Sequence, residues 1–75
     1  MLSVYPNPTS GSFIVNTTII ADAIMVTNVF GKTILEVKPN TLITEVSLQN
    51  FNNGIYFINV ISQSTSKTTR VIKTN

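Results

Sequence analysis

The chain has 75 residues and a net charge of +2, and it contains neither cysteine nor histidine. These values limit it to one small domain and exclude disulfides and any metal site built from Cys or His. Only 11% of the residues are charged, well below the usual quarter or so, and so few charges do not make a nucleic-acid-binding surface. Threonine, serine and asparagine supply most of the polar side chains, a composition common in extracellular β domains.

Short segments of β-branched and aromatic residues alternate with turn-forming residues along the whole chain. The turns recur every 8–12 residues or so, the spacing typical of a β-sandwich or barrel. The strongest signal is Asn53-Gly54, a turn pair that leads directly into an apolar run. We predict seven strands and no helix, with strands at Leu2–Tyr5, Ser12–Thr17, Ala23–Phe30, Thr33–Lys38, Ile43–Leu48, Ile55–Ser62 and Lys67–Lys73.

The segments between these strands are short. The prolines of Pro6–Gly11 lack N–H groups and cannot take part in regular pairing, and Gln63–Ser66 reads as a polar turn. Short links favour antiparallel pairing, because parallel strands need long crossovers. We therefore predict an all-β fold, a seven-stranded antiparallel immunoglobulin-like β-sandwich, with a small open barrel as the alternative.

Alternation within the strands predicts which side chains face the core. Glu45 and Ser47 belong in water, which turns their neighbours inward. An aromatic residue in the polar loop after the fifth strand, Phe51, is expected to close one end of the core. The other residues assigned to the core are Phe13, Val46, Leu48 and Phe57, and Val15 is expected to share a face with Phe13.

The chain shows no set of residues that resembles a catalytic centre. The three acidic residues, Asp22, Glu36 and Glu45, lie on separate segments, and no histidine is present to activate a serine or threonine. The acids also do not cluster as a calcium site requires. We expect no enzymatic activity, no cofactor and no metal.

Carbohydrate binding is a second class of function to consider, because the chain contains aromatic residues. It needs exposed aromatic platforms, and Tyr5 and Tyr56 are the only plausible ones. The simpler expectation is that both rings pack in the core and leave their hydroxyl groups at the rim.

Four motifs occur in order along the chain and together resemble a known family. They are Val4-Tyr5-Pro6-Asn7-Pro8 with Gly11 and Phe13, Val26–Ile34 with its Gly31-Lys32 turn, Gly54-Ile55-Tyr56-Phe57, and Arg70-Val71-Ile72-Lys73. This arrangement resembles the type A C-terminal sorting domain of the type IX (Por) secretion system of Bacteroidota. The resemblance covers nearly the whole chain, although Asn28 stands where Asp is common and Phe51 where Leu is common.

The resemblance implies a non-enzymatic sorting signal. Residues 1–75 would form one sorting domain, a fragment of a larger secreted protein whose cargo domain precedes it in the same chain. The implied partners are the translocon, shuttle and sortase-like components of the secretion system, and no nucleic acid. The cargo would pass through the periplasm to the cell surface or the medium, often with removal of the domain and attachment of the cargo to the surface. The motif residues expected to be architectural are Tyr5, Pro6, Asn7, Pro8, Gly11, Gly31, Gly54 and Tyr56.

The last predicted strand is the candidate for recognition by the secretion machinery. Basic residues gather there in a chain with few charges. In this hypothesis, the secretion machinery recognises the positive charges of Lys67, Arg70 and Lys73. Val71 and Ile72 provide apolar contact or pair with a strand of the partner. The alternative is that Val71 and Ile72 simply pack and that the charges protect a sheet edge. Self-association of two copies along an uncovered strand edge is a further expectation. A carbohydrate-binding or adhesive accessory module and a structural spacer are the competing functions.

Overall fold

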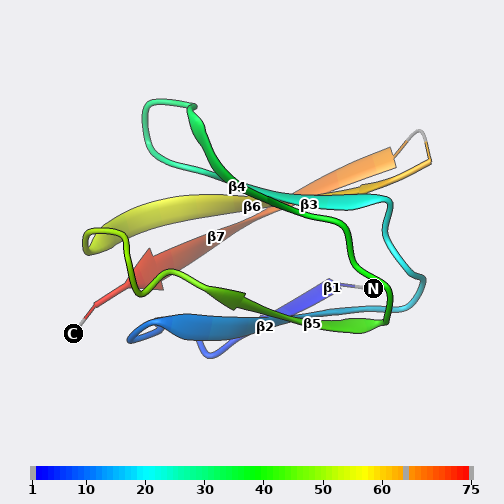
Figure 1. The fold of residues 1–75 in the computed structure, drawn as a ribbon, viewed down its shortest axis with the longest axis horizontal. Helices are drawn as coiled ribbons and strands as arrows, with labels where there is room; N and C mark the ends of the chain where they lie inside the picture. The colour runs from blue at the N-terminus through cyan, green and yellow to red at the C-terminus, as the bar shows by residue number, and fades with distance from the viewer. Residues whose placement is uncertain (1, 64, 75) are drawn as a thin grey trace.

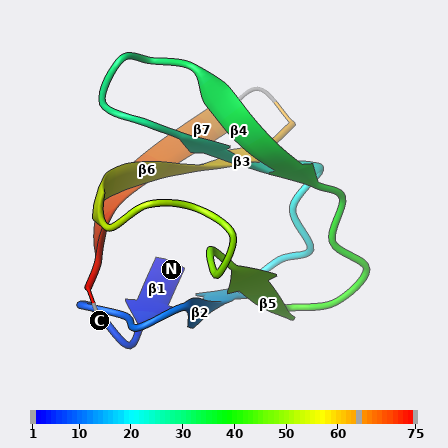
Figure 2. The ribbon, with the colours of Figure 1, turned by 60° about the vertical axis from the view of Figure 1, so that its left-hand side comes forward.

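The structure is a computed structural model that describes residues 2–63 and 65–74, and these residues form two β-sheets stacked in two layers (Figures 1 and 2). The predicted all-β fold with seven antiparallel strands is confirmed. The strands are β1 (Leu2–Tyr5), β2 (Ser12–Thr17), β3 (Ala23–Thr27), β4 (Thr33–Val37), β5 (Ile43–Ser47), β6 (Gly54–Ser62) and β7 (Thr65–Lys73).

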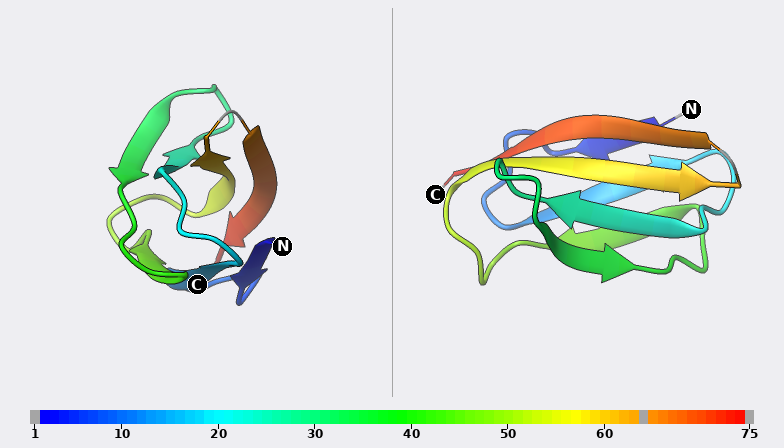
Figure 3. Two further views of the ribbon diagram at one scale, coloured as in Figure 1. Left: turned by 90° about the vertical axis from the view of Figure 1, so that its right-hand side faces the viewer. Right: turned by 90° about the horizontal axis from the view of Figure 1, so that it is seen from above.

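The strands divide into a three-stranded sheet with the order β1-β2-β5 and a four-stranded sheet with the order β4-β3-β6-β7. The end-on view in Figure 3 shows the two sheets facing each other across the interior. β1 and β7 are edge strands of different sheets and lie on the same side of the molecule. They also begin at the same end of it (Figure 1). These two neighbouring edges position the candidate site.

The core fills the space between the sheets, and strand alternation decides which residues enter it. The predictions for Phe13, Val46 and Leu48 are confirmed, Val15 lies in the core with Phe13, and Phe51 packs against the cluster from its loop. Because every second side chain of a strand faces the same way, β6 contributes its even-numbered residues. The buried cluster consists of Phe13, Val15, Ala21, Ile24, Val26, Val46, Leu48, Tyr56, Ile58, Val60 and Val71.

The prediction that Phe57 belongs to the core is wrong. Phe57 is half-buried and lies opposite Thr27 of β3 and Arg70 of β7 in the sheet. Tyr56 and Ile58, its neighbours in β6, occupy the inner face, so Phe57 lies on the outer face of the four-stranded sheet. A run of apolar residues in a strand does not show by itself which face is buried.

The predicted third strand extends too far, because β3 ends at Thr27. The side chain of Asn28 stops it: its Oδ1 accepts hydrogen bonds from the backbone N–H of Phe30 (2.9 Å) and of Lys32 (3.0 Å). This local pairing competes with the sheet and makes a turn. Gly31 has φ +83°, a backbone conformation that glycine adopts without strain. Phe30 is left 90% exposed at the tip of the turn.

The last strand begins earlier than predicted. Residues 63–66 were expected to form a turn, but Thr65 already pairs with Ser62. Ser64 lies outside the described residues. Only the short link between Ser62 and Thr65 separates β6 from β7, so β7 is nine residues long. β6 and β7 form the longest paired ribbon of the fold.

Candidate recognition site

The five residues assigned to recognition lie on β7 and divide between its two faces. Val71 and Lys73 are buried on the inner face, whereas Arg70 is exposed and Ile72 is half-buried on the outer face. Lys67 belongs to the inner face and lies opposite the core residue Val60, but its side chain is exposed. The structure brings these residues onto one strand without making one continuous surface of them.

Val71 and Lys73 fix β7 in place. Val71 is fully buried in the core, and Lys73 is only 7% exposed, with its Nζ donating a hydrogen bond of 3.0 Å to Oδ1 of Asn53. A buried ammonium group needs such an acceptor, because an unpaired charge in the interior is strongly unfavourable. In the folded domain these two side chains support the strand and are not accessible to a partner. Of the charges assigned to recognition, those of Lys67 and Arg70 remain accessible.

The segment of residues 6–11, which we call the proline loop, pairs with the C-terminal half of β7. The side-chain amide of Asn7 makes the hydrogen bonds that the backbone of a paired strand would make. Its Nδ2 donates to the carbonyl of Arg70 (2.8 Å) and its Oδ1 accepts from the N–H of Ile72 (3.1 Å). Thr9 continues the pattern, with its N–H donating to the carbonyl of Ile72 and its carbonyl accepting from the N–H of Thr74, both at 2.8 Å. The edge of β7 is therefore covered from Arg70 onward.

Thr9 is the site residue that the sequence reasoning missed. It is 2% exposed, and its hydroxyl donates to the carbonyl of Ser12 (2.6 Å) and accepts from the N–H of Gly11 (3.1 Å). The loop was expected to lack regular pairing, yet Thr9 forms a parallel bridge with Lys73. The available signal was the threonine two residues before Gly11, a spacing typical of a side-chain-stabilised turn.

The N-terminal half of β7 has no such cover. The contacts of the proline loop show that the backbone groups of Arg70, Ile72 and Thr74 point away from β6. Backbone groups alternate in direction along a strand, so those of Ser66 and Thr68 point the same way. Within residues 2–63 and 65–74, no segment pairs with these outward groups. We call residues 65–69 the open half of β7.

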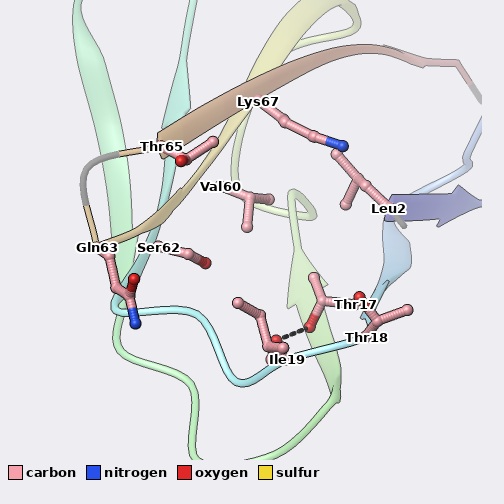
Figure 4. A pocket seen from close by; sticks show the side chains of 9 residues that line it. All are labelled: Leu2, Thr17, Thr18, Ile19, Val60, Ser62, Gln63, Thr65 and Lys67. Carbon is pink, nitrogen blue, oxygen red and sulfur yellow. Dashed lines mark hydrogen bonds between the residues drawn. The ribbon is translucent and has the colours of Figure 1, made fainter.

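A pocket of about 220 Å³ lies beside the open half, between the ends of the two sheets (Figure 4). Apolar side chains of Leu2, Ile19 and Val60 line it together with polar groups, and Lys67 extends its amine across it toward Leu2. The full lining is Leu2, Thr17, Thr18, Ile19, Val60, Ser62, Gln63, Thr65 and Lys67. Lys67 is the one charged residue in this lining, and its side-chain amine makes no hydrogen bond or ion pair with the part of the chain that the structure describes.

The motif residues expected to be architectural divide into buried and exposed ones. Tyr56 is buried and its hydroxyl donates to the carbonyl of Asn52 at 2.5 Å, as predicted for a ring in the core with its hydroxyl at the rim. Tyr5 does not fit that prediction, because it is 46% exposed. Its peptide bond to Pro6 and that between Asn7 and Pro8 are cis.

The two remaining motif glycines differ in what they contact. Gly11 is buried beside Gln49, whose Cγ would lie 3.1 Å from an added Cβ, and its carbonyl accepts from the N–H of Leu48 at 2.7 Å. Gly54, which opens β6 with φ +154°, has open space where a Cβ would stand. Gly11 therefore joins the proline loop to the end of β5, and Gly54 serves the turn before β6.

The described residues bring together no cluster of metal-ligating side chains. No group of three or more His, Cys, Asp or Glu side chains gathers within them, and none of their buried polar side-chain atoms lacks a hydrogen-bond partner. They contain no helix of the length and hydropathy that crossing a membrane requires. The accessible features are strand edges, exposed basic residues and the pocket, which suit contact with another polypeptide.

Comparison with known proteins gives one family. The family model described as "Secretion system C-terminal sorting domain" matches residues 3–74, nearly the whole chain. No curated protein gives a significant match.

Proposed function

Because the chain belongs to the family of secretion system C-terminal sorting domains, a C-terminal signal for type IX secretion, we propose that the exposed part of β7 is where the secretion machinery recognises it. A protein that carries this domain is secreted to the cell surface or the extracellular space.

One observation carries this assignment. Two of the five basic residues, Lys67 and Arg70, are exposed on a sheet-edge strand that contains no acidic residue. An exposed edge strand presents backbone groups and side chains together, and both can be recognised by a partner. Val71 and Lys73 contribute indirectly by holding the strand, and Ile72 offers a half-buried apolar contact.

The cargo, the export route and the partners are proposed from the family. The cargo is an N-terminal domain of the same chain, and it crosses the periplasm before it reaches the outer membrane. The partners are the translocon, shuttle and sortase-like components of the type IX system, and in many cases removal of the domain is followed by surface attachment of the cargo. The domain itself acts without catalysis.

The immunoglobulin-like designation is also a proposal, and the strand order supports it. Immunoglobulin-like sandwiches combine a sheet of the first, second and fifth strands with a sheet of the third, sixth and seventh, and some move the fourth strand to the second sheet. The orders β1-β2-β5 and β4-β3-β6-β7 follow that pattern. Two separate sheets do not support the open barrel.

Export of a reporter tests the assignment to β7. A fluorescent protein carrying an export signal and this domain is expressed in a bacterium with a type IX system, and the extracellular fraction is measured. The double variant Lys67→Ala/Arg70→Ala is expected to reduce export several-fold. The matched control Lys32→Ala/Lys38→Ala removes two exposed basic residues elsewhere and should leave export unchanged. Equal export by the two double variants would reject recognition through β7.

Point substitutions are preferable to truncation in this test. A chain ending at Thr69 loses Val71 from the core and the partners of Asn7 and Thr9 on β7. Such a chain would fail to fold, so its failure to be exported would not report on recognition. Circular dichroism and melting of both double variants should match the wild-type domain.

A further inference from the structure

The edge of β7 is open over only half its length, and most of the exposed side chains of the strand are in that half. The proline loop covers the edge from Arg70 onward, whereas Thr65, Ser66, Lys67 and Thr68 are exposed. An unpaired edge of this kind is a template for another strand, because its N–H and C=O groups have the spacing that a strand requires.

We propose that the open half of β7 receives an extended strand of another polypeptide, which lies along the edge of β7 and places apolar and acidic side chains toward the pocket. This proposal rests on the proposed function, since it names the kind of partner that the exposed part of β7 receives. The added strand would pair with the outward backbone groups of Ser66 and Thr68.

The other sheet edges are less suited to such pairing. β1 has only four residues and is followed by Pro6, and β5 has five. β4 also has five, and a register shift interrupts its pairing with β3. Short strands and irregularities of this kind protect edges from unwanted partners. The open half of β7 has neither a proline nor a bulge and continues a nine-residue strand.

The pocket supplies the second part of the recognition. Side chains of a strand alternate between its faces, so every second residue of an added strand would point into the space between the sheets. Leu2, Ile19 and Val60 offer apolar contact there. Lys67 offers a cation with no partner in the described part of the chain, which favours an acidic side chain on the incoming strand.

The charge of β7 argues against a second copy of this chain as the occupant. β7 carries Lys67 and Arg70 near its edge and no acidic residue. Two copies paired through this edge would bring like charges together without a compensating acid, which is unfavourable across paired strands. An acidic strand of another polypeptide has the complementary charge.

Nuclear magnetic resonance with short capped peptides tests the proposal on the 75-residue chain. The first peptide alternates threonine with isoleucine and carries one glutamate among the isoleucines. The second has lysine in place of the glutamate. The third has the sequence of the first but carries methyl groups on its backbone nitrogens, so it has no N–H groups to donate to the carbonyl groups of β7. We measure the dissociation constants and the hydrogen exchange of the amides of β7.

The first peptide should slow exchange at Ser66 and Thr68, whose amides point outward, while Lys67 and Thr69 are already protected by β6. The second and third peptides should bind roughly tenfold more weakly or not at all. Lys67→Glu should reverse the preference between glutamate and lysine, and Lys38→Glu, an exposed control, should not. Thr68→Pro removes an outward N–H and should abolish binding in a folded domain.

Several results would overturn the proposal. Equal binding of the N-methylated peptide would show that the pocket binds apolar side chains without strand pairing. Protection at β4 or β5 would place the added strand on another edge. Dimerisation that protects Ser66 and Thr68 without any peptide would make a second copy the occupant. If the peptides do not bind but Lys67 and Arg70 still control export, strand addition at the open half is rejected and recognition through β7 stands. If export does not depend on Lys67 and Arg70, recognition through β7 is rejected, whether or not the peptides bind.

Discussion

Asn7 shows how a single side chain replaces a strand. Its amide donates to the carbonyl of Arg70 and accepts from the N–H of Ile72, the two bonds that a neighbouring strand would make. A strand with a proline on each side of Asn7 has too few N–H groups to do this with its backbone alone. The asparagine amide supplies both a donor and an acceptor, which the carboxylate of aspartate does not.

Replacing Asn7 should therefore destabilise the domain in a graded way. We expect Asn7→Ala to lower the free energy of unfolding by about 1–2 kcal/mol, because both bonds are lost at a partly solvated edge. Asn7→Asp keeps the acceptor for Ile72 and should fall between alanine and the wild type. Urea denaturation measures these values, with Asn50→Ala as an exposed control. A wild-type midpoint for Asn7→Ala would mean that Thr9 alone holds the edge.

Asn28 has a different role, because only its oxygen is used. Oδ1 accepts from the N–H groups of Phe30 and Lys32, so a carboxylate can do the same work. We expect Asn28→Asp to preserve or raise the stability, since bonds to a charged acceptor are stronger and Lys32 is close in sequence. Asn28→Ala should lower it by about 1 kcal/mol. Thermal melting of the two variants checks this, and equal melting would show that Gly31 alone determines the turn.

At the scale of the strand, β6 shows why one apolar segment contains residues of very different importance. Its inner residues Tyr56, Ile58 and Val60 are buried, and Phe57 lies half-buried on the opposite face. Loss of a phenyl ring costs most where the surrounding atoms cannot close around the vacated space. Burial, rather than residue type, sets the expected cost.

Phe13→Ala and Phe57→Ala should therefore differ. Phe13 is fully buried, and its replacement should cost about 3–5 kcal/mol, enough to unfold a domain of this size. Phe57→Ala should cost about 1–2 kcal/mol and leave a folded domain, because solvent already reaches the ring. Circular dichroism and denaturant midpoints distinguish the two. Unfolding by both variants would indicate that the outer face of the sheet is covered in solution.

The elements themselves were predictable from local patterns, and their ends were not. All seven strands were found because β-branched residues and turn signals act within a few residues. The end of β3 depends on a side-chain oxygen, and the early start of β7 depends on pairing with β6. The exposed residues Lys67 and Arg70 were identified from charge alone. The covering of Arg70 and Ile72 by Asn7 links residues more than 60 positions apart, which no local pattern reveals.

At the scale of the whole molecule, β7 connects parts that are otherwise separate. It pairs with β6 in one sheet, contributes Val71 to the core, and receives the proline loop, which follows β1 of the other sheet. The first and last segments of the domain are therefore held together by β7. This makes folding depend on the last residues of β7.

A chain that ends at Thr69 should accordingly be unfolded. It loses a fully buried valine and every bond between the proline loop and β7. For a domain this small, these losses exceed the few kcal/mol of stability expected. Circular dichroism should show a disordered spectrum for this truncation and a sheet spectrum for Lys67→Ala/Arg70→Ala. A folded truncation would show that the two sheets associate without the end of β7.

The closure of the proline loop on Arg70, Ile72 and Thr74 has a consequence for synthesis in the cell. The acceptors and donors for Asn7 and Thr9 lie on and just after the last strand of the domain, so the domain cannot complete its fold until that strand has been made. A cargo protein cut within this domain by a premature stop or by a protease would lack a finished signal. The geometry of one loop thus reserves export for polypeptides that carry the whole domain.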